Sequence, residues 1–210
     1  MTSLSVTVIV AAHNCAPTID RAIASALEQA ETAEVIVVDD ASSDDTVVRA
    51  GAWTERDGRV HVISLSENAG PAGARNRAMD AATGDVLAIL DSDDFFGPGR
   101  LAHLLGDVGW DMAADNVVFV REDATDTLDF AALPGADCGF DDLGLGRFVR
   151  GNLSDGLRAR GEMGFLKPLM DRRFLERNGL RYDPSLRLGE DYDLYMRMLL
   201  AGARFRVTLR

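Results

Sequence analysis

Short apolar runs alternate with amphipathic segments through the first ninety residues of the chain. Four runs rich in β-branched and other apolar residues are typical of parallel strands buried on both faces, at 6–11, 34–39, 60–64 and 86–90. Apolar residues at helical spacing predict helices between them, near 17–30, 47–53 and 72–82. This alternation predicts right-handed crossovers and an open α/β sheet, with its site at the carboxyl ends of the strands.

The pattern is less regular after Pro98. The acidic, glycine-rich stretch 122–146 has no clear periodicity, and we interpret it as an excursion or lid. The other elements expected in this half are a helix at 100–105, a strand at 117–120, helices at 172–178 and 191–201, and a strand at 205–209. The sequence stops within this last strand, which predicts that it is a fragment of a longer chain.

Composition narrows the class of protein. Hydrophobic residues make up 47% and charged residues 27%, which is typical of a folded globular chain. The 22 basic and 34 acidic residues give a net charge of −12, which argues against general binding to nucleic acid. Cys15 and Cys138 are too few for a disulfide framework and favour a reducing, cytosolic compartment. No basic leader and no apolar run long enough to span a membrane is present.

Acidic residues follow the fourth expected strand on one tight turn. Asp91, Asp93 and Asp94 place three carboxylates there, with Ser92 between them, and such carboxylates repel one another without a cation. Mg²⁺ or Mn²⁺ binds one or two protein carboxylates and completes its coordination with water and phosphate oxygens. The turn therefore suggests a metal site for a nucleoside diphosphate, whereas the alternative is a set of turn-forming and helix-capping aspartates.

Two further strand ends carry polar residues. Asp39 and Asp40 end the second strand, and the sheet rule places their loop beside Asn14 and the Asp91 turn. A carboxylate at this position can accept a hydrogen bond from an imide N–H such as that of uracil. An Asx turn that caps the following helix is the alternative.

The loop at 70–76 could offer backbone N–H groups and the Arg75 guanidinium to a diphosphate. Neither GxGxxG nor GxxxxGK[ST] occurs, which argues against NAD enzymes and P-loop NTPases. His13, His61 and His103 have no spaced histidine or cysteine neighbours, and we interpret them as structural or surface residues.

Glu190 and Asp191 open the amphipathic helix near the end of the chain. Acidic residues in a first helical turn are ordinary partners of the helix dipole, but a carboxylate here could also act as a general base. Adjacent helical residues point about 100° apart, so the two could not flank one glycosidic bond as a hydrolase pair. We expect one base and one supporting carboxylate.

Five motifs taken together resemble the family 2 glycosyltransferases over nearly the whole chain. They are VTVIVAAHN at 6–14, VIVVDDASSDDT at 35–46, NAGPAGARNRAM at 68–79, LAILDSDD at 87–94 and GED at 189–191. The segment 161–175 is similar to the stretch before the catalytic acidic pair in bacterial members that assemble succinoglycan-type exopolysaccharide.

The resemblance implies a GT-A fold, a Rossmann-like open mixed sheet flanked by helices. One domain over 1–210 would combine a nucleotide-sugar-binding half at 1–97 with an acceptor and catalytic-base half at 98–210. It also implies inverting transfer from a nucleotide-sugar donor, usually a UDP-sugar, assisted by Mg²⁺ or Mn²⁺. The expected acceptor is a saccharide or lipid-linked saccharide, and the expected location is the cytoplasm, at the inner face of the membrane.

The resemblance also implies roles for individual residues. Asp40 would bind the uracil, with Asp39 nearby, and Asp191 would be the base beside Glu190. Asp93 and Asp94 would ligate the metal, with the register of the two left open. The other expected donor-binding residues are Ala11, Ala12 and Asn14 around the nucleoside, Gly73 and Arg75 toward the diphosphate, and Asp91, Ser92 and Asp93 near the ribose and metal.

Two alternatives remain from the sequence. A nucleotidyltransferase would carry a glycine-rich, basic loop after the first strand, but 11–17 reads AAHNCAP. A degenerate nucleotide-sugar-binding module would be expected to lack the acidic residues, and both Asp94 and Asp191 are present. Lys167, the only lysine, could add positive charge near the donor or lie on the surface.

Overall fold

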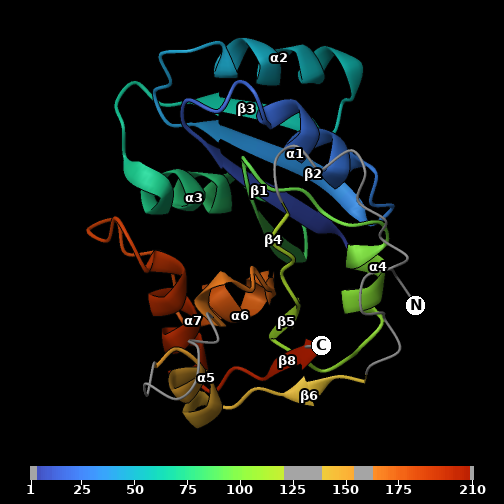
Figure 1. The fold of residues 1–210 in the computed structure, drawn as a ribbon, viewed down its shortest axis with the longest axis vertical. Helices are drawn as coiled ribbons and strands as arrows, with labels where there is room; N and C mark the ends of the chain where they lie inside the picture. The colour runs from blue at the N-terminus through green and yellow to red at the C-terminus, as the bar shows by residue number, and fades with distance from the viewer. Residues whose placement is uncertain (1–3, 121–138, 154–162, 209–210) are drawn as a thin grey trace.

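One open sheet runs through the molecule in the computed structural model, which describes residues 4–120, 139–153 and 163–208. Within these ranges the sheet has eight strands in the order β3-β2-β1-β4-β7-β5-β8-β6 (Figure 1). The strands are β1 Val6–Ala12, β2 Thr32–Asp39, β3 Val60–Ser64, β4 Val86–Asp91, β5 Met112–Asp115, β6 Asp141–Asp142, β7 Leu169–Asp171 and β8 Phe205–Thr208.

Helices cover both faces of the sheet (Figure 1). They are α1 Ile19–Leu27, α2 Thr46–Arg56, α3 Gly70–Ala81, α4 Arg100–Leu105, α5 Leu145–Gly151, α6 Arg172–Arg177 and α7 Glu190–Leu200, together with the 3₁₀ turn η3 Met163–Phe165. A buried hydrophobic cluster lies on each face of the sheet. Helices α1, α2 and α4 contribute to one cluster, whereas α3, α5, α6 and α7 contribute to the other. The sequence prediction of an α/β sheet flanked by helices is confirmed.

The first four strands are parallel, as the alternating pattern predicts. Their register brings the carboxyl ends together, because Ala12 pairs with Asp39 and Ala11 pairs with Asp91. The expected polar loops therefore start from one edge of the sheet. The helix prediction at 72–82 is slightly late at both ends, since α3 spans Gly70–Ala81.

The second half extends the same sheet with mixed directions. β7 runs antiparallel to β4 and β5, β8 runs parallel to β5, and β6 is antiparallel to β8. The parallel half and this extension together make the open mixed sheet that the resemblance implies.

The strand expected at 117–120 is wrong. The strand in this region is β5, where Met112 and Ala113 pair with both neighbouring strands and are fully buried. Val118 and Phe119 have the β-branched and aromatic character of a strand, but they are 46% and 81% exposed. Pairing partners decide the strand here, and an alanine-rich run between two sheet neighbours outweighs intrinsic β-propensity.

The stretch interpreted as an excursion or lid divides into two parts. Residues 121–138 lie outside the described residues. The end of the stretch belongs to the fold, because β6 pairs with β8 and α5 begins at Leu145. The interpretation as an excursion or lid is therefore wrong for 141–146. The strand β6 at the edge of the described sheet consists of two acidic residues, so no apolar run in the sequence indicated that it pairs with β8.

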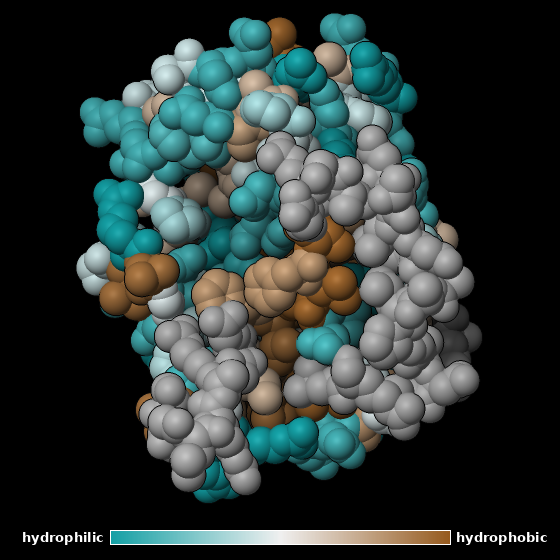
Figure 2. All heavy atoms as spheres, viewed as in Figure 1, coloured by the Kyte–Doolittle hydropathy of each residue, from teal (hydrophilic) through white to brown (hydrophobic). Residues whose placement is uncertain are grey.

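The face drawn in Figure 2 is hydrophilic in its upper part, which carries α1 to α3, and along its lower edge near β6. Hydrophobic side chains gather between these two regions (Figure 2). No helix within the described ranges combines the length and the apolar composition needed to cross a membrane.

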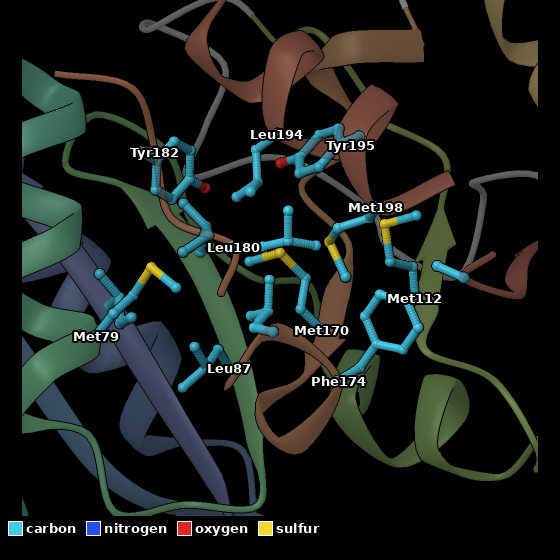
Figure 3. Packing of buried hydrophobic residues seen from close by; sticks show 14 of the residues in the cluster. Met79, Leu87, Met112, Met170, Phe174, Leu180, Tyr182, Leu194, Tyr195 and Met198 are labelled. Carbon is cyan, nitrogen blue, oxygen red and sulfur yellow. The ribbon is translucent and has the colours of Figure 1, made fainter. Parts of the chain in front are cut away.

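The two halves meet through a methionine-rich core (Figure 3). Met79 of α3, Met170 of β7 and Met198 of α7 lie in one buried cluster with Leu87 and Tyr182. Methionine side chains are unbranched and adapt to irregular gaps, so they fit a seam between elements that cross in different directions. This packing sets α7 against the sheet on the same face as α3.

A buried carboxylate fastens the amino ends of the strands, opposite the polar loops. Oε1 of Glu34 accepts hydrogen bonds from the Thr7 hydroxyl at 2.6 Å, the Thr83 N–H at 2.6 Å and the Thr83 hydroxyl at 2.8 Å. Gly84 allows this close approach, since a Cβ there would lie 2.7 Å from the backbone nitrogen of Thr7. Burial acts to raise the pKa of Glu34, but the hydrogen bonds from Thr7 and Thr83 outweigh it and lower the pKa below the usual 4.5.

We expect Glu34→Gln to lower the free energy of unfolding at neutral pH by ~1–3 kcal/mol, because charge-assisted hydrogen bonds are replaced by weaker ones. The folded state lowers the Glu34 pKa, so its stabilisation is complete above the unfolded-state value near 4.5 and is lost as pH falls through the folded value. Urea unfolding should show that the free energies of unfolding of the wild type and Glu34→Gln differ less at pH 4 than at pH 7. The exposed Glu55→Gln is the control, and a difference that stays constant with pH contradicts this role.

Candidate active site

The loops after β1 and β2 are joined by hydrogen bonds at the carboxyl edge of the sheet. Oδ1 of Asn14 accepts from the backbone N–H of Ser43 at 2.8 Å, and the Ser42 hydroxyl accepts from the N–H of Asn14 at 2.9 Å. Asn14 and Ala41 both have left-handed backbones, with φ of 50° and 56°. Such conformations cost free energy in non-glycine residues and cluster at functional sites. The predicted neighbourhood of Asn14 and the Asp39 loop is confirmed.

The two aspartates at the end of β2 have different environments. Asp40 is buried, and its carboxylate accepts from the N–H groups of Ala69 at 2.6 Å and Gly70 at 2.9 Å, at the start of α3. Asp39 is also buried, but its Oδ1 has no hydrogen-bond partner within the described residues. Both carboxylate oxygens of Asp40 therefore hold the start of α3, whereas Oδ1 of Asp39 is a buried acceptor at the sheet edge without a partner in the described part of the chain.

Three residues to which the sequence gave no individual role in the site lie against the loop after β2. Nδ1 of His13 donates to the Asp40 carbonyl at 2.8 Å, and Asn68 donates to the same carbonyl at 3.2 Å. Arg187, from the loop before α7, donates to Oδ1 of Asn68 at 3.2 Å and lies against Gly70, where a Cβ would be 2.3 Å from its Nη1. The loop before α7 therefore reaches across to the start of α3, next to the loop after β2.

The first turns of α3 carry Gly73 and Arg75. A Cβ on Gly73 would lie 2.7 Å from the Cβ of Ala69, so the helix start has no room for a side chain there. Arg75 points inward rather than toward solvent and is 4% exposed. Its guanidinium also stacks over the ring of Tyr182, 5.3 Å from the centroid.

Five charged side chains form one largely buried cluster between α3, the end of β4, the segment before β7 and the start of α7. Arg75 donates from Nη2 to Asp91 at 2.7 Å, and from Nη1 to Glu190 at 2.7 Å and Asp191 at 3.2 Å. Lys167 places its Nζ 2.7 Å from Asp91 and 2.6 Å from Asp191. The cluster joins the end of β4 to the first turn of α7, and Glu190 and Asp191 both reach one guanidinium despite their different directions on the helix.

Opposite charges keep Asp91 and Lys167 ionised in spite of desolvation. Desolvation acts to raise the pKa of Asp91, but Lys167 and Arg75 outweigh it and lower that pKa. Desolvation likewise acts to lower the pKa of Lys167, and the carboxylates of Asp191 and Asp91 raise it above its usual value. Asp91 and Lys167 therefore both carry their charges at neutral pH.

Two tyrosines lie behind the cluster. Burial raises the pKa of both Tyr182 and Tyr195 far above the usual value, and the charge of Asp191 adds to this effect. Both side chains are at most 2% exposed and belong to the core in Figure 3. They form a solvent-inaccessible wall behind the cluster, and charges interact more strongly beside such a wall than in open solvent.

The aspartates after β4 divide into two groups. Asp91 is bound by the two cations, whereas the carboxylates of Asp93 and Asp94 are exposed and form no hydrogen bond within the described residues. Desolvation and the nearby charges of Asp91 and Asp93 raise the pKa of Asp94. Ser92 is half-buried on the turn between them.

The residues present fit a cation only together with ligands from a bound molecule. In the described part of the chain, no three histidine, cysteine or acidic residues gather closely enough to hold a metal by themselves. Asp93 and Asp94 supply two free carboxylates, and Mg²⁺ takes one or two carboxylates from a protein when substrate phosphates complete its shell.

Most of the residues singled out from the sequence thus gather at one edge of the sheet. Ala11 and Ala12 end β1 beside Asp91 and Asp39. The sequence left open whether Lys167 lies near the donor or on the surface, and the structure places it between two acidic residues. Because Lys167 is the only lysine in the chain, it could have been singled out from the sequence. Tyr182 and Tyr195 gave no signal in the sequence, because single tyrosines without a motif around them are common in cores.

The comparisons with known proteins agree with this geometry. The model of the family described as glycosyl transferase family 2 matches residues 7–162. Succinoglycan biosynthesis protein ExoU of Rhizobium meliloti (strain 1021) is 47% identical over 207 residues, which cover 96% of this chain and 59% of the relative. The chain thus spans about three fifths of the length of this curated relative.

Two solved structures have the same fold at low sequence identity. S. aureus TarS 1-349 in complex with UDP has a TM-score of 0.74 at 21% identity, and the match covers 98% of this chain and 58% of the TarS 1-349 chain. The mannosyltransferase PcManGT of Pyrobaculum calidifontis, in complex with GDP-Man and Mn²⁺, has a TM-score of 0.67 at 20% identity, covering 99% of this chain and 57% of PcManGT. The open mixed sheet with helices on both faces is thus the GT-A fold, and the chain belongs to glycosyl transferase family 2.

Proposed function

We propose that this chain carries out inverting transfer of a sugar from a UDP-sugar to a saccharide or lipid-linked saccharide during exopolysaccharide synthesis. The observation that carries the proposal is the buried cluster that joins Asp91, at the donor end of β4, to Asp191, in the first turn of α7. The printed role of ExoU in succinoglycan biosynthesis supports the polysaccharide product. The work would take place on the cytoplasmic side of the membrane.

The donor nucleoside would bind at the ends of β1 and β2, beside Ala11, Ala12 and Asn14. Of the two aspartates there, we assign the uracil imide to Asp39, because its Oδ1 is free while both oxygens of Asp40 hold the start of α3. Asp40 would support the pocket from behind. The UDP bound to TarS, which shares this fold, supports a uridine donor.

A divalent cation would be held by Asp93 and Asp94 together with the donor diphosphate. When bound, it would offset the negative charge that develops on the departing diphosphate. The free carboxylates of the two residues and the Mn²⁺ in the PcManGT complex support this assignment. Ser92 and Asp91 would shape the same turn.

Asp191 would act as the general base. It would accept the proton of the acceptor hydroxyl while that oxygen bonds to the anomeric carbon, and the bond from this carbon to the diphosphate would break on the opposite face. Inversion follows from this single displacement. Glu190 would support the base by holding Arg75, to which it lies closer than Asp191 does.

An acceptor with an apolar part fits the surface around this base. Phe165 of η3 and Leu188, two residues before Glu190, are 45% and 87% exposed. Hydrophobic side chains also gather in the middle of the face drawn in Figure 2. Exposed apolar patches often mark sites for lipid or protein partners, which supports a lipid-linked saccharide as the acceptor.

Titration of UDP into the protein by calorimetry tests the donor site. We expect binding in the presence of Mn²⁺ that weakens at least ~10-fold with EDTA or in Asp94→Ala, because the charge-assisted contacts to the diphosphate are lost. The exposed Asp80→Ala is the matched control and should bind UDP as the wild type does. Absence of UDP binding under every condition would contradict the uridine donor.

The base is tested by release of UDP from UDP-glucose, UDP-galactose and UDP-N-acetylglucosamine, each supplied without acceptor so that water takes its place. Asp191→Asn should slow the release by ~10²-fold or more, because general base catalysis is removed. Its affinity for UDP should stay unchanged. Glu190→Gln should slow UDP release less than Asp191→Asn does. Equal slowing in both variants would mean that the two carboxylates have not been assigned correctly.

Arg75 is tested by stability and affinity together. We expect Arg75→Met to lower the free energy of unfolding by ~3–5 kcal/mol, because it leaves three carboxylates without their buried partner. Combining it with Glu190→Gln should restore part of this loss, as urea unfolding would measure. UDP affinity in the double variant should remain close to that of Glu190→Gln, whereas a strong loss would make Arg75 the diphosphate ligand that the sequence predicts.

A further inference from the structure

The charged cluster contains a ring in which each of two carboxylates is held by the same two cations. Oδ1 of Asp91 and Oδ1 of Asp191 both accept from Arg75, and Oδ2 of each lies against Nζ of Lys167. The two oxygens of Asp191 are thereby fixed by different residues. Lys167 has a specific place in this ring, and the donor and base assignments give it no role.

The two cations do not hold Asp191 equally. Nη1 of Arg75 donates to Glu190 at 2.7 Å and to Asp191 at 3.2 Å, so its hydrogen bond to Asp191 is the longer of the two. Nζ of Lys167 lies 2.6 Å from Oδ2 of Asp191 and, among the residues that the structure describes, pairs with no other side chain of α7. The direction of the Asp191 carboxylate therefore depends mainly on Lys167.

The backbone at Lys167 is arranged to deliver this contact. Lys167 has a φ of 47°, although it is not a glycine and it precedes Pro168. The residue before a proline normally adopts an extended conformation, and strained positions persist where the surrounding structure holds them. Nη2 of Arg100 donates to the Lys167 carbonyl at 2.9 Å, while its Nε donates to Asp115 at 3.0 Å.

We propose that Lys167 is a positioning residue that orients Asp191 as the base and holds it at a fixed place relative to the donor strand end. The proposal rests on the proposed function of Asp191. Nζ of Lys167 lies within hydrogen-bond distance of both Asp91 and Asp191, so its charge acts on these two carboxylates. A carboxylate that turns away by even a small distance loses its alignment with the acceptor hydroxyl.

The experiment compares Lys167→Met, which keeps the length of the side chain and removes its charge, with Lys167→Arg, which keeps the charge. Arg49→Met, which breaks an exposed ion pair with Asp20, is the control for loss of a cation. For each protein, UDP affinity is measured by calorimetry, and kcat and KM are measured for UDP release from the most rapidly hydrolysed sugar of the three named above. Thermal unfolding identifies any variant that fails to fold.

We expect Lys167→Met to lower kcat by ~10-fold or more while KM and UDP affinity change little, because the base is misaligned and the donor site is intact. Lys167→Arg should recover part of kcat. An unchanged kcat overturns the proposal, and so does a loss of UDP affinity, which would make Lys167 a donor ligand instead.

The single lysine provides a second readout that does not depend on turnover. Labelling lysine with ¹³C at Cε gives one side-chain NMR signal, which should shift in Asp191→Asn and stay in place in Asp193→Asn. If the wild-type chain binds UDP but releases none, the proposed function fails in its present form. A signal that ignores Asp191→Asn would then overturn the positioning role by itself, and a shifted signal would support it.

Discussion

The buried ion pairs of Arg75 are the interaction on which the arrangement of this protein depends. One guanidinium, 4% exposed, contacts Asp91 of β4 and both Glu190 and Asp191 of α7. Taking such charges out of water is costly, and the cost is offset only while every partner stays in place. The cluster therefore fixes α7 against the strand ends more narrowly than the adaptable methionine packing beneath it could, and it places the proposed base opposite the proposed donor.

Much of the first half follows from sequence pattern alone. Continuous β-branched runs and helical spacing predict β1 to β4 with small errors at the ends, because parallel strands buried on both faces have a distinctive composition. The sheet rule then places Asn14, Asp39 and Asp91 at one edge, as the register of β1 with its neighbours confirms. Local regularity is what makes this half predictable.

The second half and the details of the site depend on contacts between distant residues. Met112 and Ala113 form a strand because β7 and β8 lie on either side, which no local pattern encodes. The inward direction of Arg75 and the place of Lys167 likewise depend on residues far along the chain. Sequence motifs identify the chemical groups of such a site, whereas the three-dimensional packing decides which group each one contacts.

The position of β8 has a consequence for how the protein is made. β8 lies inside the sheet, between β5 and β6, although β5 ends at Asp115 and β8 begins only at Phe205. The strands of the first half can pair soon after they leave the ribosome, but β5 must wait for β8 to complete its pairing. Non-local pairing of this kind slows folding and exposes an unpaired edge in the meantime. Nascent chains of this protein should therefore be most prone to aggregation after β5 has emerged and before β8 has joined the sheet.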